Sequence, residues 1–311
     1  MIPGLRHLLA VHDLTREDVQ GLFREAAALK AMRRRALATQ RLSGKTLGLF
    51  FEKPSTRTRV SFEAGMNQLG GQSLFLSVTD IQMRRGESVA DTARVLSRYL
   101  DGLVIRSYAH STVEEWARYA TIPVINGLTE LHHPCQVLSD LFTIREKKRR
   151  LKGVKIAYVG DGNNVANSLI EGVALMGMAI SVACPSGYEP AASIVEWATG
   201  RARRTGASIE ILRDPSVAVK GADVLYTDVW TSMGQEKEEA HRLEVFGPYQ
   251  LNERLLAAAQ PDAIVMHCLP AHRGQEITTG ALDGPHSVVL DQAENRLHVQ
   301  KAILIRLLRD R

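Results

Sequence analysis

The chain has 311 residues, of which 45% are hydrophobic and 23% charged, and its formal net charge is +5. This length exceeds the size at which one core usually keeps growing, so we expect two α/β-sized domains. Three cysteines argue against a disulfide-rich scaffold, and the absence of a signal-peptide-like start or of any long uncharged apolar run argues against export or membrane insertion, so we expect a cytoplasmic protein.

Helical and strand patterns alternate along the first half of the chain. Residues 15–34 carry apolar side chains at helical spacing after a Thr-x-x-Asp start that is typical of a capping box. The short apolar run at 46–51 indicates a buried strand. Further helices are expected at 62–69, 88–99 and 113–119, and further strands at 73–76, 102–105 and 124–125.

A charged stretch at 145–152 precedes a second series of the same kind. Its strands are expected at 155–159, 180–183, 208–211, 224–227 and 263–266, and the last stretch, 292–309, has a helical pattern. Strands alternating with helices predict parallel sheets. The fold class is therefore α/β with two doubly wound parallel-sheet domains, at 1–147 and 148–291.

The segment 53–59, Lys-Pro-Ser-Thr-Arg-Thr-Arg, directly follows the first expected strand. Hydroxyls and guanidinium groups at a helix N-terminus form an anion site, because the free N–H groups and the helix dipole favour negative charge. The Gly-rich stretch of a P-loop is missing. The spacing alone is equally compatible with an ordinary Ser/Thr helix cap followed by two surface arginines.

This segment resembles the carbamoyl-phosphate loop of the aspartate/ornithine carbamoyltransferase family. Further motifs of the family follow in order along most of the chain: Gln82 with Arg-Gly-Glu-Ser at 85–88, Arg106, His-Pro-Cys-Gln at 133–136, Asp-Gly-Asn-Asn at 161–164, Asp-Val-Trp-Thr-Ser-Met-Gly at 228–234, His-Cys-Leu-Pro at 267–270, and Arg296. Asp228, the Ser-Met-Gly loop and Cys268 are similar to the ornithine branch. Taken singly, 133–136 would be a turn with a buried cysteine and Cys268 a small core residue.

The resemblance implies transfer of a carbamoyl group from carbamoyl phosphate to the side-chain amine of ornithine, in arginine metabolism. It implies that the C-terminal helix, 292–311, packs back on the first domain, which binds carbamoyl phosphate, while the second binds ornithine. The expected carbamoyl-phosphate ligands are Ser55, Thr56, Arg57, Thr58, Gln82, Arg106, His133, Pro134, Cys135, Gln136, Cys268, Leu269 and Arg296. The expected ornithine ligands are Asn164, Asp228, Ser232 and Met233.

Within this set the resemblance gives catalytic roles to Arg106, His133, Cys268 and Asp228. Donors from Arg106, His133 and Thr58 would face the carbamoyl oxygen, which gains charge as the neutral amine attacks. The departing phosphate is a candidate for the proton acceptor. No metal or organic cofactor is implied, and the family pattern implies a homotrimer with active sites shared between subunits.

Two other functions are compatible with single features of the sequence. The Gly-Asp-Gly at 160–162 after a strand permits a nicotinamide dehydrogenase, but the third glycine of that fingerprint is replaced by Val165, and Cys184 with Pro185 follows the next strand in place of an acidic residue. The positive charge permits nucleic-acid binding, but the basic runs at 33–35, 147–150 and 201–204 are separate and not interleaved with aromatic residues.

Overall fold

A computed structural model describes residues 6–35, 39–77, 86–231 and 236–309. The chain divides into two compact units, which we call unit 1 (Met1–Ser139 with Asn295–Arg311) and unit 2 (Asp140–Glu294). Both boundaries fall inside helices, in α5 (Pro134–Lys148) and α12 (Val289–Leu308). The sequence-based boundaries, at 147/148 and 291/292, lie eight residues after the first of these points and three residues before the second.

Unit 1 is built on a parallel sheet with the strand order β2-β1-β3-β4 among the described residues. Its strands are β1 (Thr46–Phe51), β2 (Gln72–Ser77), β3 (Gly102–Arg106) and β4 (Val124–Leu128). Its helices, besides its parts of α5 and α12, are η1 (Val11–Asp13), α1 (Arg16–Arg34), α2 (Thr56–Gln68), α3 (Val89–Leu96) and α4 (His110–Tyr119).

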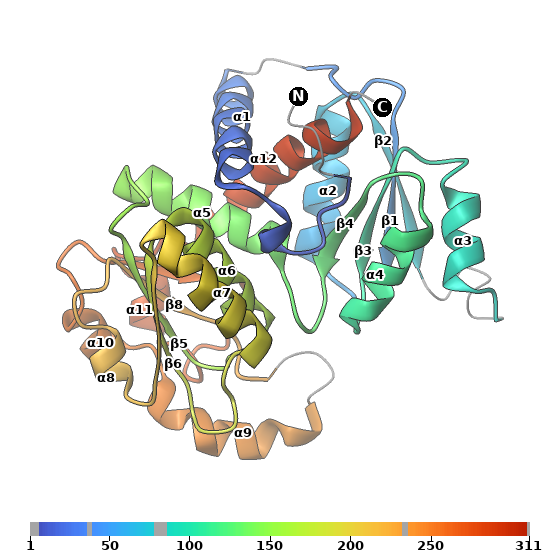
Figure 1. The fold of residues 1–311 in the computed structure, drawn as a ribbon. Helices are drawn as coiled ribbons and strands as arrows, with labels where there is room; N and C mark the ends of the chain where they lie inside the picture. The colour runs from blue at the N-terminus through green and yellow to red at the C-terminus, as the bar shows by residue number, and fades with distance from the viewer. Residues whose placement is uncertain (1–5, 36–38, 78–85, 232–235, 310–311) are drawn as a thin grey trace. The chain divides into compact units, whose positions relative to one another are not determined.

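Helices cover both faces of this sheet (Figure 1). On the face covered by α3 and α4, Phe50 and Ile105 of the sheet pack with Trp116 of α4, and the Phe50 and Trp116 ring centroids are 5.1 Å apart. The edge strand β4 is covered by the N-terminal segment, where the Leu8 N–H donates to the Val124 carbonyl at 2.9 Å. This pairing blunts an exposed sheet edge.

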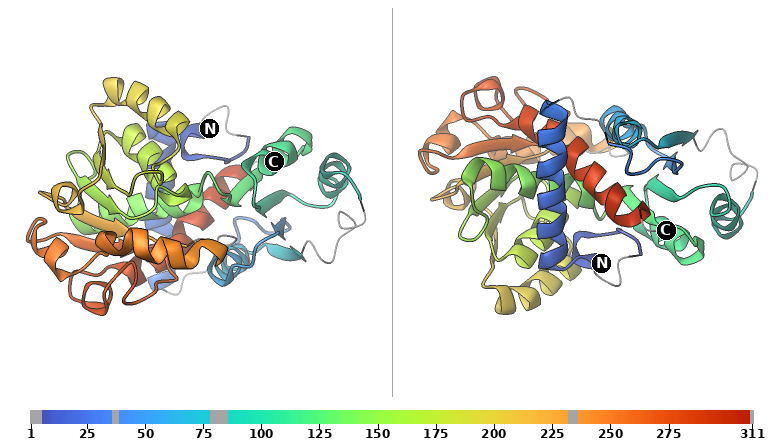
Figure 2. Two further views of the ribbon diagram at one scale, coloured as in Figure 1. Left: turned by 90° about the horizontal axis from the view of Figure 1, so that it is seen from below. Right: turned by 90° about the horizontal axis from the view of Figure 1, so that it is seen from above.

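The C-terminal helix α12 crosses α1 within unit 1 (Figure 2). Two buried or half-buried polar contacts join the helices: Lys30 Nζ donates to Asn295 Oδ1 at 2.7 Å, and Arg306 Nη2 donates to Asp18 Oδ1 at 2.5 Å. Asp18 also completes the capping box of α1 with Thr15, as the sequence predicted. The prediction that the C-terminal helix packs back on the first domain is confirmed.

Unit 2 contains a parallel sheet with the order β7-β6-β5-β8-β9 among its described residues. Its strands are β5 (Lys155–Val159), β6 (Ala179–Ala183), β7 (Ser208–Leu212), β8 (Val224–Thr227) and β9 (Ile264–His267). Its other elements are α6 (Asn164–Met176), α7 (Ala192–Thr205), α8 (Pro215–Ala218), η4 (Glu236–Glu238), α9 (Glu239–Phe246), η5 (Gly247–Tyr249), α10 (Glu253–Ala257) and α11 (Thr279–Asp283).

The core of unit 2 forms because both faces of its sheet carry apolar side chains. Helix α6 is buried along most of its length, begins at the capping side chain of Asn163 and ends at Gly177, whose φ of 71° lies in the left-handed region. A second layer packs Val159 and Leu225 of the sheet against Phe246, Leu255 and Leu282. A sheet buried on both faces explains why these strands are near-continuous apolar runs.

The α/β class with two parallel sheets is confirmed, and all nine expected strands are present with bounds that differ by at most a few residues. Helix α2 begins at Thr56 rather than at 62, because Ser55 supplies the cap. Residues 145–148 of the charged stretch form the last turn of α5, where basic side chains suit the helix dipole. None of the helices in the described ranges has the length and apolar character needed to cross a membrane.

Candidate functional site

In each sheet, the predicted functional residues follow strands at the point where the strand order reverses. In unit 1 the reversal lies between β1 and β3, which lead to Ser55 and Arg106. In unit 2 it lies between β5 and β8, which lead to Asn164 and Asp228. Ligands of open α/β sheets bind outside the carboxyl ends of the strands at this switch point. Both units therefore place polar residues where a ligand is expected.

The residues predicted to bind an anion lie in and around the first turn of α2. Ser55 is the N-cap residue, and its Oγ accepts a hydrogen bond from the Thr58 N–H at 3.3 Å. Arg57 is half-buried in this turn, and Arg106, the last residue of β3, is buried. The residues thus serve as a helix cap and also bring cations to the positive end of a helix. The two interpretations left open by the sequence are compatible with each other.

Arg296 of α12 organises the floor of this site within unit 1. Its Nη2 donates to Thr58 Oγ1 at 2.7 Å, and its Nη1 donates to Gln136 Oε1. All three side chains are almost fully buried. A guanidinium that bridges two separate motifs holds both at a fixed spacing, because its donors have a rigid planar geometry. Arg296 therefore connects the segment after β1 with the start of α5.

His133 is buried beside three arginines. Burial lowers the pKa of His133 well below its usual value, and the charges of Arg296, Arg106 and Arg57 lower it further. The imidazole is therefore neutral near pH 7, with one ring nitrogen as donor and the other as acceptor. A neutral donor can polarise a carbonyl oxygen without losing its proton.

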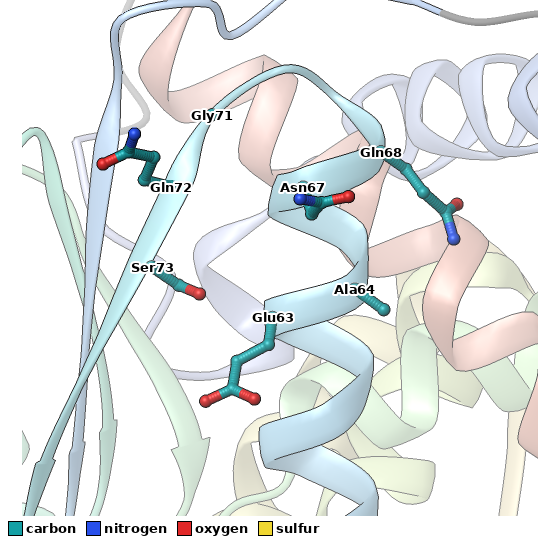
Figure 3. Close-up of a pocket in the computed structure, with 7 residues that line it drawn as sticks. All are labelled: Glu63, Ala64, Asn67, Gln68, Gly71, Gln72 and Ser73. Atoms are coloured by element: carbon teal, nitrogen blue, oxygen red, sulfur yellow. The ribbon is translucent and has the colours of Figure 1, made fainter.

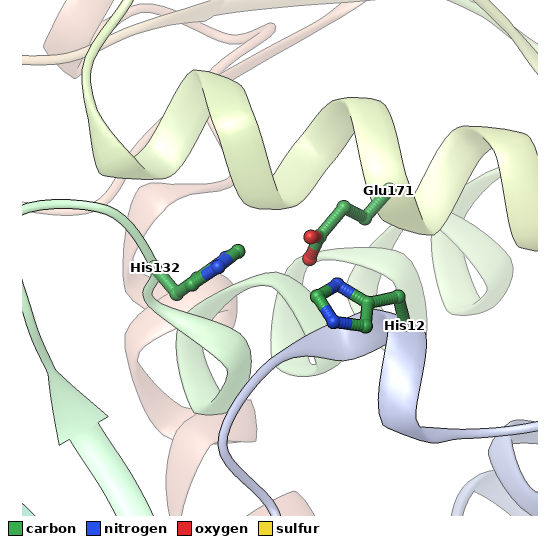
Figure 4. Close-up of side chains that lie close together, drawn as sticks. All are labelled: His12, His132 and Glu171. Carbon is green, nitrogen blue, oxygen red and sulfur yellow. The ribbon is translucent and has the colours of Figure 1, made fainter. Parts of the chain in front are cut away.

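The turn before His133 is held by its neighbour His132. The Thr129 N–H donates to the His132 carbonyl at 2.9 Å, and the His132 N–H donates back to Thr129 Oγ1 at 3.1 Å. The His132 ring packs against His12 with centroids 5.6 Å apart, as Figure 4 shows, and against His110 at 4.6 Å. Burial, and then the proximity of His132, lowers the pKa of His110. These contacts make the turn a firm support for His133.

Cys135 has a structural role in the same helix. Its Sγ donates to the Asn126 carbonyl at 3.5 Å, and the side chain is fully buried. Burial raises the pKa of Cys135 to about 12, despite the opposing charge of Arg296. A buried protonated thiol is unreactive. Pro134, also buried, is the first residue of α5, a position that suits a residue without an N–H.

In unit 2, Asp228 is the centre of a polar cluster. Cys268 Sγ donates to Asp228 Oδ1 at 2.9 Å, and Asn163 Nδ2 donates to Asp228 Oδ2 at 2.8 Å. Asn163 Oδ1 accepts from Tyr158 Oη at 3.2 Å and caps α6. Asp228 and Cys268 are predicted site residues, whereas Asn163 is not, although it belongs to the Asp-Gly-Asn-Asn motif at 161–164. Asn164, the predicted ligand, is the half-buried first residue of α6.

A second buried contact secures the segment after β8. Arg242 Nη1 donates to Asp161 Oδ2 at 2.9 Å and to the Trp230 carbonyl at 2.7 Å. Burial raises the pKa of Asp161 to about 6, although Arg242 lowers it. Gly162 is required beside Asp161, because a Cβ there would lie 2.2 Å from the Pro190 nitrogen. No sequence pattern singles out Arg242, because it lies in a very polar stretch.

Among the described residues, three side chains of unit 2 lie close enough together to be considered as metal ligands. Asp228, His267 and Cys268 offer ligand atoms within 4.8 Å of one another. However, His267 Nδ1 accepts from the Leu269 N–H at 2.9 Å, and His267 Nε2 lies 3.1 Å from Glu276 Oε1. Both ring nitrogens are engaged, so a metal would have to displace one of these bonds. The set therefore fits a metal poorly.

Three predicted ligands, Gln82, Ser232 and Met233, lie outside the described residues. The remaining ones fall into two groups. Unit 1 brings together Ser55, Thr56, Arg57, Thr58, Arg106, His133, Pro134, Cys135, Gln136 and Arg296, and unit 2 contains Asn164, Asp228, Cys268 and Leu269.

A surface cavity in unit 1 is separate from the anion site. It has a volume of about 550 Å³ and lies between α2 and the start of β2 (Figure 3). Its lining on α2 begins at Glu63, roughly two helical turns beyond Ser55. It borders the amino end of β2, whereas the anion site follows the carboxyl end of β1. None of the predicted ligands among the described residues lines this cavity.

Comparison with known proteins covers both units. Residues 6–146 match the family model "Aspartate/ornithine carbamoyltransferase, carbamoyl-P binding domain", and residues 152–307 match the corresponding "Asp/Orn binding domain". The chain is 56% identical over 299 residues to an ornithine carbamoyltransferase of Syntrophus aciditrophicus, covering 96% of this chain and 98% of the relative. It is 54% identical over 299 residues to an anabolic ornithine carbamoyltransferase of Pyrococcus furiosus, covering 96% and 95%.

Solved structures agree with these matches. The ornithine carbamoyltransferase structure from Pyrococcus furiosus superimposes with a TM-score of 0.94 at 53% identity and covers 97% of both chains. The anabolic enzyme from Campylobacter jejuni superimposes with a TM-score of 0.93 at 41% identity, covering 99% of this chain and 100% of the other. Together with the anion site of unit 1 and the Asp228 cluster of unit 2, these matches show that the chain belongs to the aspartate/ornithine carbamoyltransferase family of enzymes.

Proposed function

We propose that this enzyme is an ornithine carbamoyltransferase, which converts carbamoyl phosphate and L-ornithine into L-citrulline and phosphate. The observation that carries the choice of ornithine is the contact between Asp228 and Cys268. A carboxylate in a partly buried polar cluster complements a cationic amino acid. The acceptor of an aspartate-specific enzyme would instead require additional cations in unit 2. The names of the relatives support the same choice.

Carbamoyl phosphate is proposed to bind at the first turn of α2. The phosphate oxygens would accept from the N–H groups and hydroxyls of this turn and from Arg57 and Arg106. Because the phosphate gains charge as it leaves, these donors act more strongly in the transition state than on the bound substrate. Neutral His133 with Arg106 would donate to the carbamoyl oxygen, with about 3 kcal/mol for each well-placed donor.

The attacking group is proposed to be the neutral side-chain amine of ornithine. An alkylamine of this kind has a reference pKa of about 10.4, so only a small fraction is neutral near pH 7. Asp228 and Cys268 would orient this amine, while Asn164 and the loop containing Ser232 and Met233 would hold the amino-acid end. The leaving phosphate would accept the proton. The name of the Pyrococcus furiosus relative supports a role in arginine biosynthesis, and we place the enzyme in the cytoplasm.

A panel of acceptors tests the choice of ornithine. With carbamoyl phosphate in excess, we expect L-ornithine to be preferred over putrescine by roughly 10³-fold or more in kcat/KM, because putrescine leaves the partners of the amino-acid head group unpaired. N-acetylornithine and aspartate should be poorer still. Carbamoylated product is quantified by mass spectrometry without added nucleotide. Comparable rates with putrescine would refute the assignment.

We also propose a homotrimer in which Gln82 of one subunit completes the carbamoyl-phosphate site of its neighbour. A closed ring of heterologous contacts gives each site one such visiting residue. Arg57→Gln and Gln82→Ala variants are unfolded and refolded together. Random mixing leaves roughly a quarter of sites with both residues intact, so activity should reappear although each parent is inactive. Mixed trimers that form but stay inactive would show that sites are not shared.

A further inference from the structure

The carboxylate of Glu276 is hydrogen-bonded to the last residue of β9 and to the segment that follows this strand. Glu276 is fully buried, and its Oε1 accepts two hydrogen bonds, from His267 Nε2 at 3.1 Å and from the His272 N–H at 2.6 Å. The Glu276 carbonyl also accepts from the Leu251 N–H at 2.9 Å. Glu276 therefore stands at a fixed position beside the end of β9.

The hydrogen bonds fix the tautomer of His267. Its Nδ1 faces the Leu269 N–H at 2.9 Å and must accept, so Nε2 carries the proton and donates to Glu276. A second proton on Nδ1 would place two donors against each other. Burial raises the pKa of Glu276, but its hydrogen bonds with His267 and the His272 N–H lower it by more, so the group is ionised near neutral pH. An ionised acceptor favours the tautomer that the loop requires.

This tautomer supports an unusual backbone. Leu269 has a φ of 58°, in the left-handed region that β-carbon-bearing residues rarely adopt. The bond from its N–H to His267 Nδ1 is made in that conformation. On the other side, the His267 N–H donates to Gln292 Oε1 at 3.0 Å. The backbone of 267–269 is thus held from two directions, and Cys268 between them reaches Asp228.

We propose that Glu276 is a positioning residue for the carbamoyl transfer, acting through the His267 tautomer on Cys268 and Leu269. This inference rests on the proposed function for its kinetic part. It extends that function to a residue with no expected contact to either substrate. The arrangement is a carboxylate, an imidazole and a backbone N–H in series, in which the carboxylate sets the imidazole and the imidazole sets the loop.

The test compares two substitutions at one position. Glu276→Met keeps the approximate volume but removes the acceptor, so the imidazole loses its restraint and the loop shifts. We expect kcat/KM for ornithine to fall about 100-fold, the cost of roughly a 1 Å misplacement. Glu276→Gln retains an acceptor oxygen for both donors, and its amide can face His272 Nδ1, which lies 3.7 Å from Oε2. It should restore most of the loss.

A chemical readout separates this inference from the proposed function. Cys268 is partly exposed, whereas Cys135 and Cys184 are fully buried and serve as internal references. The iodoacetamide labelling rate of Cys268 is measured by peptide mass spectrometry. It should rise about 10-fold or more in Glu276→Met, because a shifted loop breaks the hydrogen bond between the Cys268 thiol and Asp228. In Glu276→Gln the rate should stay near the parental value. This rate requires no carbamoyl transfer.

A second variant that destabilises unit 2 tests whether the effects of Glu276→Met come only from a general loss of stability. Leu282→Ala, in α11, empties a buried core position of unit 2, and the apolar Leu282 side chain takes no part in the hydrogen bond between Glu276 and His267. It should lower the melting temperature but leave Cys268 labelling and the kinetic constants of the folded enzyme unchanged. Parental labelling and kinetics in Glu276→Met, or equal changes in Leu282→Ala, would overturn the proposal. If the parent transfers no carbamoyl group to ornithine while labelling still follows the Glu276 variants, only the proposed function fails.

Discussion

Replacing Arg57 by glutamine is expected to lower kcat/KM for carbamoyl phosphate by about 10³-fold, through kcat as well as through binding. Arg57 lies in the first turn of α2, where the helix dipole already favours an anion. In the proposed mechanism its guanidinium adds a charge-assisted contact that strengthens as the phosphate leaves. Glutamine keeps a donor but loses the charge. Initial rates at saturating ornithine, together with phosphate binding by calorimetry, measure both effects.

Arg59 supplies a matched control two residues further along the same helix. Its side chain is exposed, pairs with Glu63 at 2.9 Å and stacks on Phe75 with the guanidinium carbon 3.8 Å from the ring centroid. Arg59→Gln removes the same charge from the same helix, and we expect less than a threefold change in kcat/KM, since an exposed pair contributes little. If both variants behave alike, the segment is an ordinary helix cap.

The sequence predicted well those features that depend on neighbours along the chain. The strand at 46–51, the capping box at Thr15 and the helix cap at Ser55 each arise from a local pattern of apolar, hydroxyl or acidic residues. The same local view placed the start of α2 too late, at Phe62, because polar residues fill its first turns and hide the helical spacing.

Residues whose roles depend on distant partners were not predictable in this way. The role that we propose for Glu276 depends on the turn after β9, which brings its carboxylate within 3.1 Å of His267 Nε2. Arg242 donates a hydrogen bond to the Trp230 carbonyl. Because every residue has a backbone carbonyl, a pattern of side chains cannot indicate such a partner. Arg296 is identified only from its match to a family motif. Its side chain bridges Thr58 and Gln136, which lie 238 and 160 positions away in the sequence.

Replacing Asp228 by asparagine should lower kcat/KM for ornithine by about 10³-fold while changing the KM for carbamoyl phosphate little. Both carboxylate oxygens of Asp228 accept hydrogen bonds, from Cys268 and from Asn163. Asparagine has a single acceptor oxygen, so its amide would meet one of these donors. The variant therefore loses the charge that we propose attracts the ornithine cation, and it disturbs the two groups that hold the side chain in place.

Asp214→Asn is the control, because Asp214 is an exposed N-cap residue of α8 and asparagine caps equally well. It should match the parent. The role of the carboxylate is identified by whether the fall in kcat/KM for ornithine in Asp228→Asn comes from KM or from kcat. A raised KM with unchanged kcat means that Asp228 binds ornithine equally in the ground and transition states, whereas a lower kcat means that it orients the attacking amine. Because we assign it an orienting role, we expect most of the loss in kcat, and a loss confined to KM would contradict that assignment.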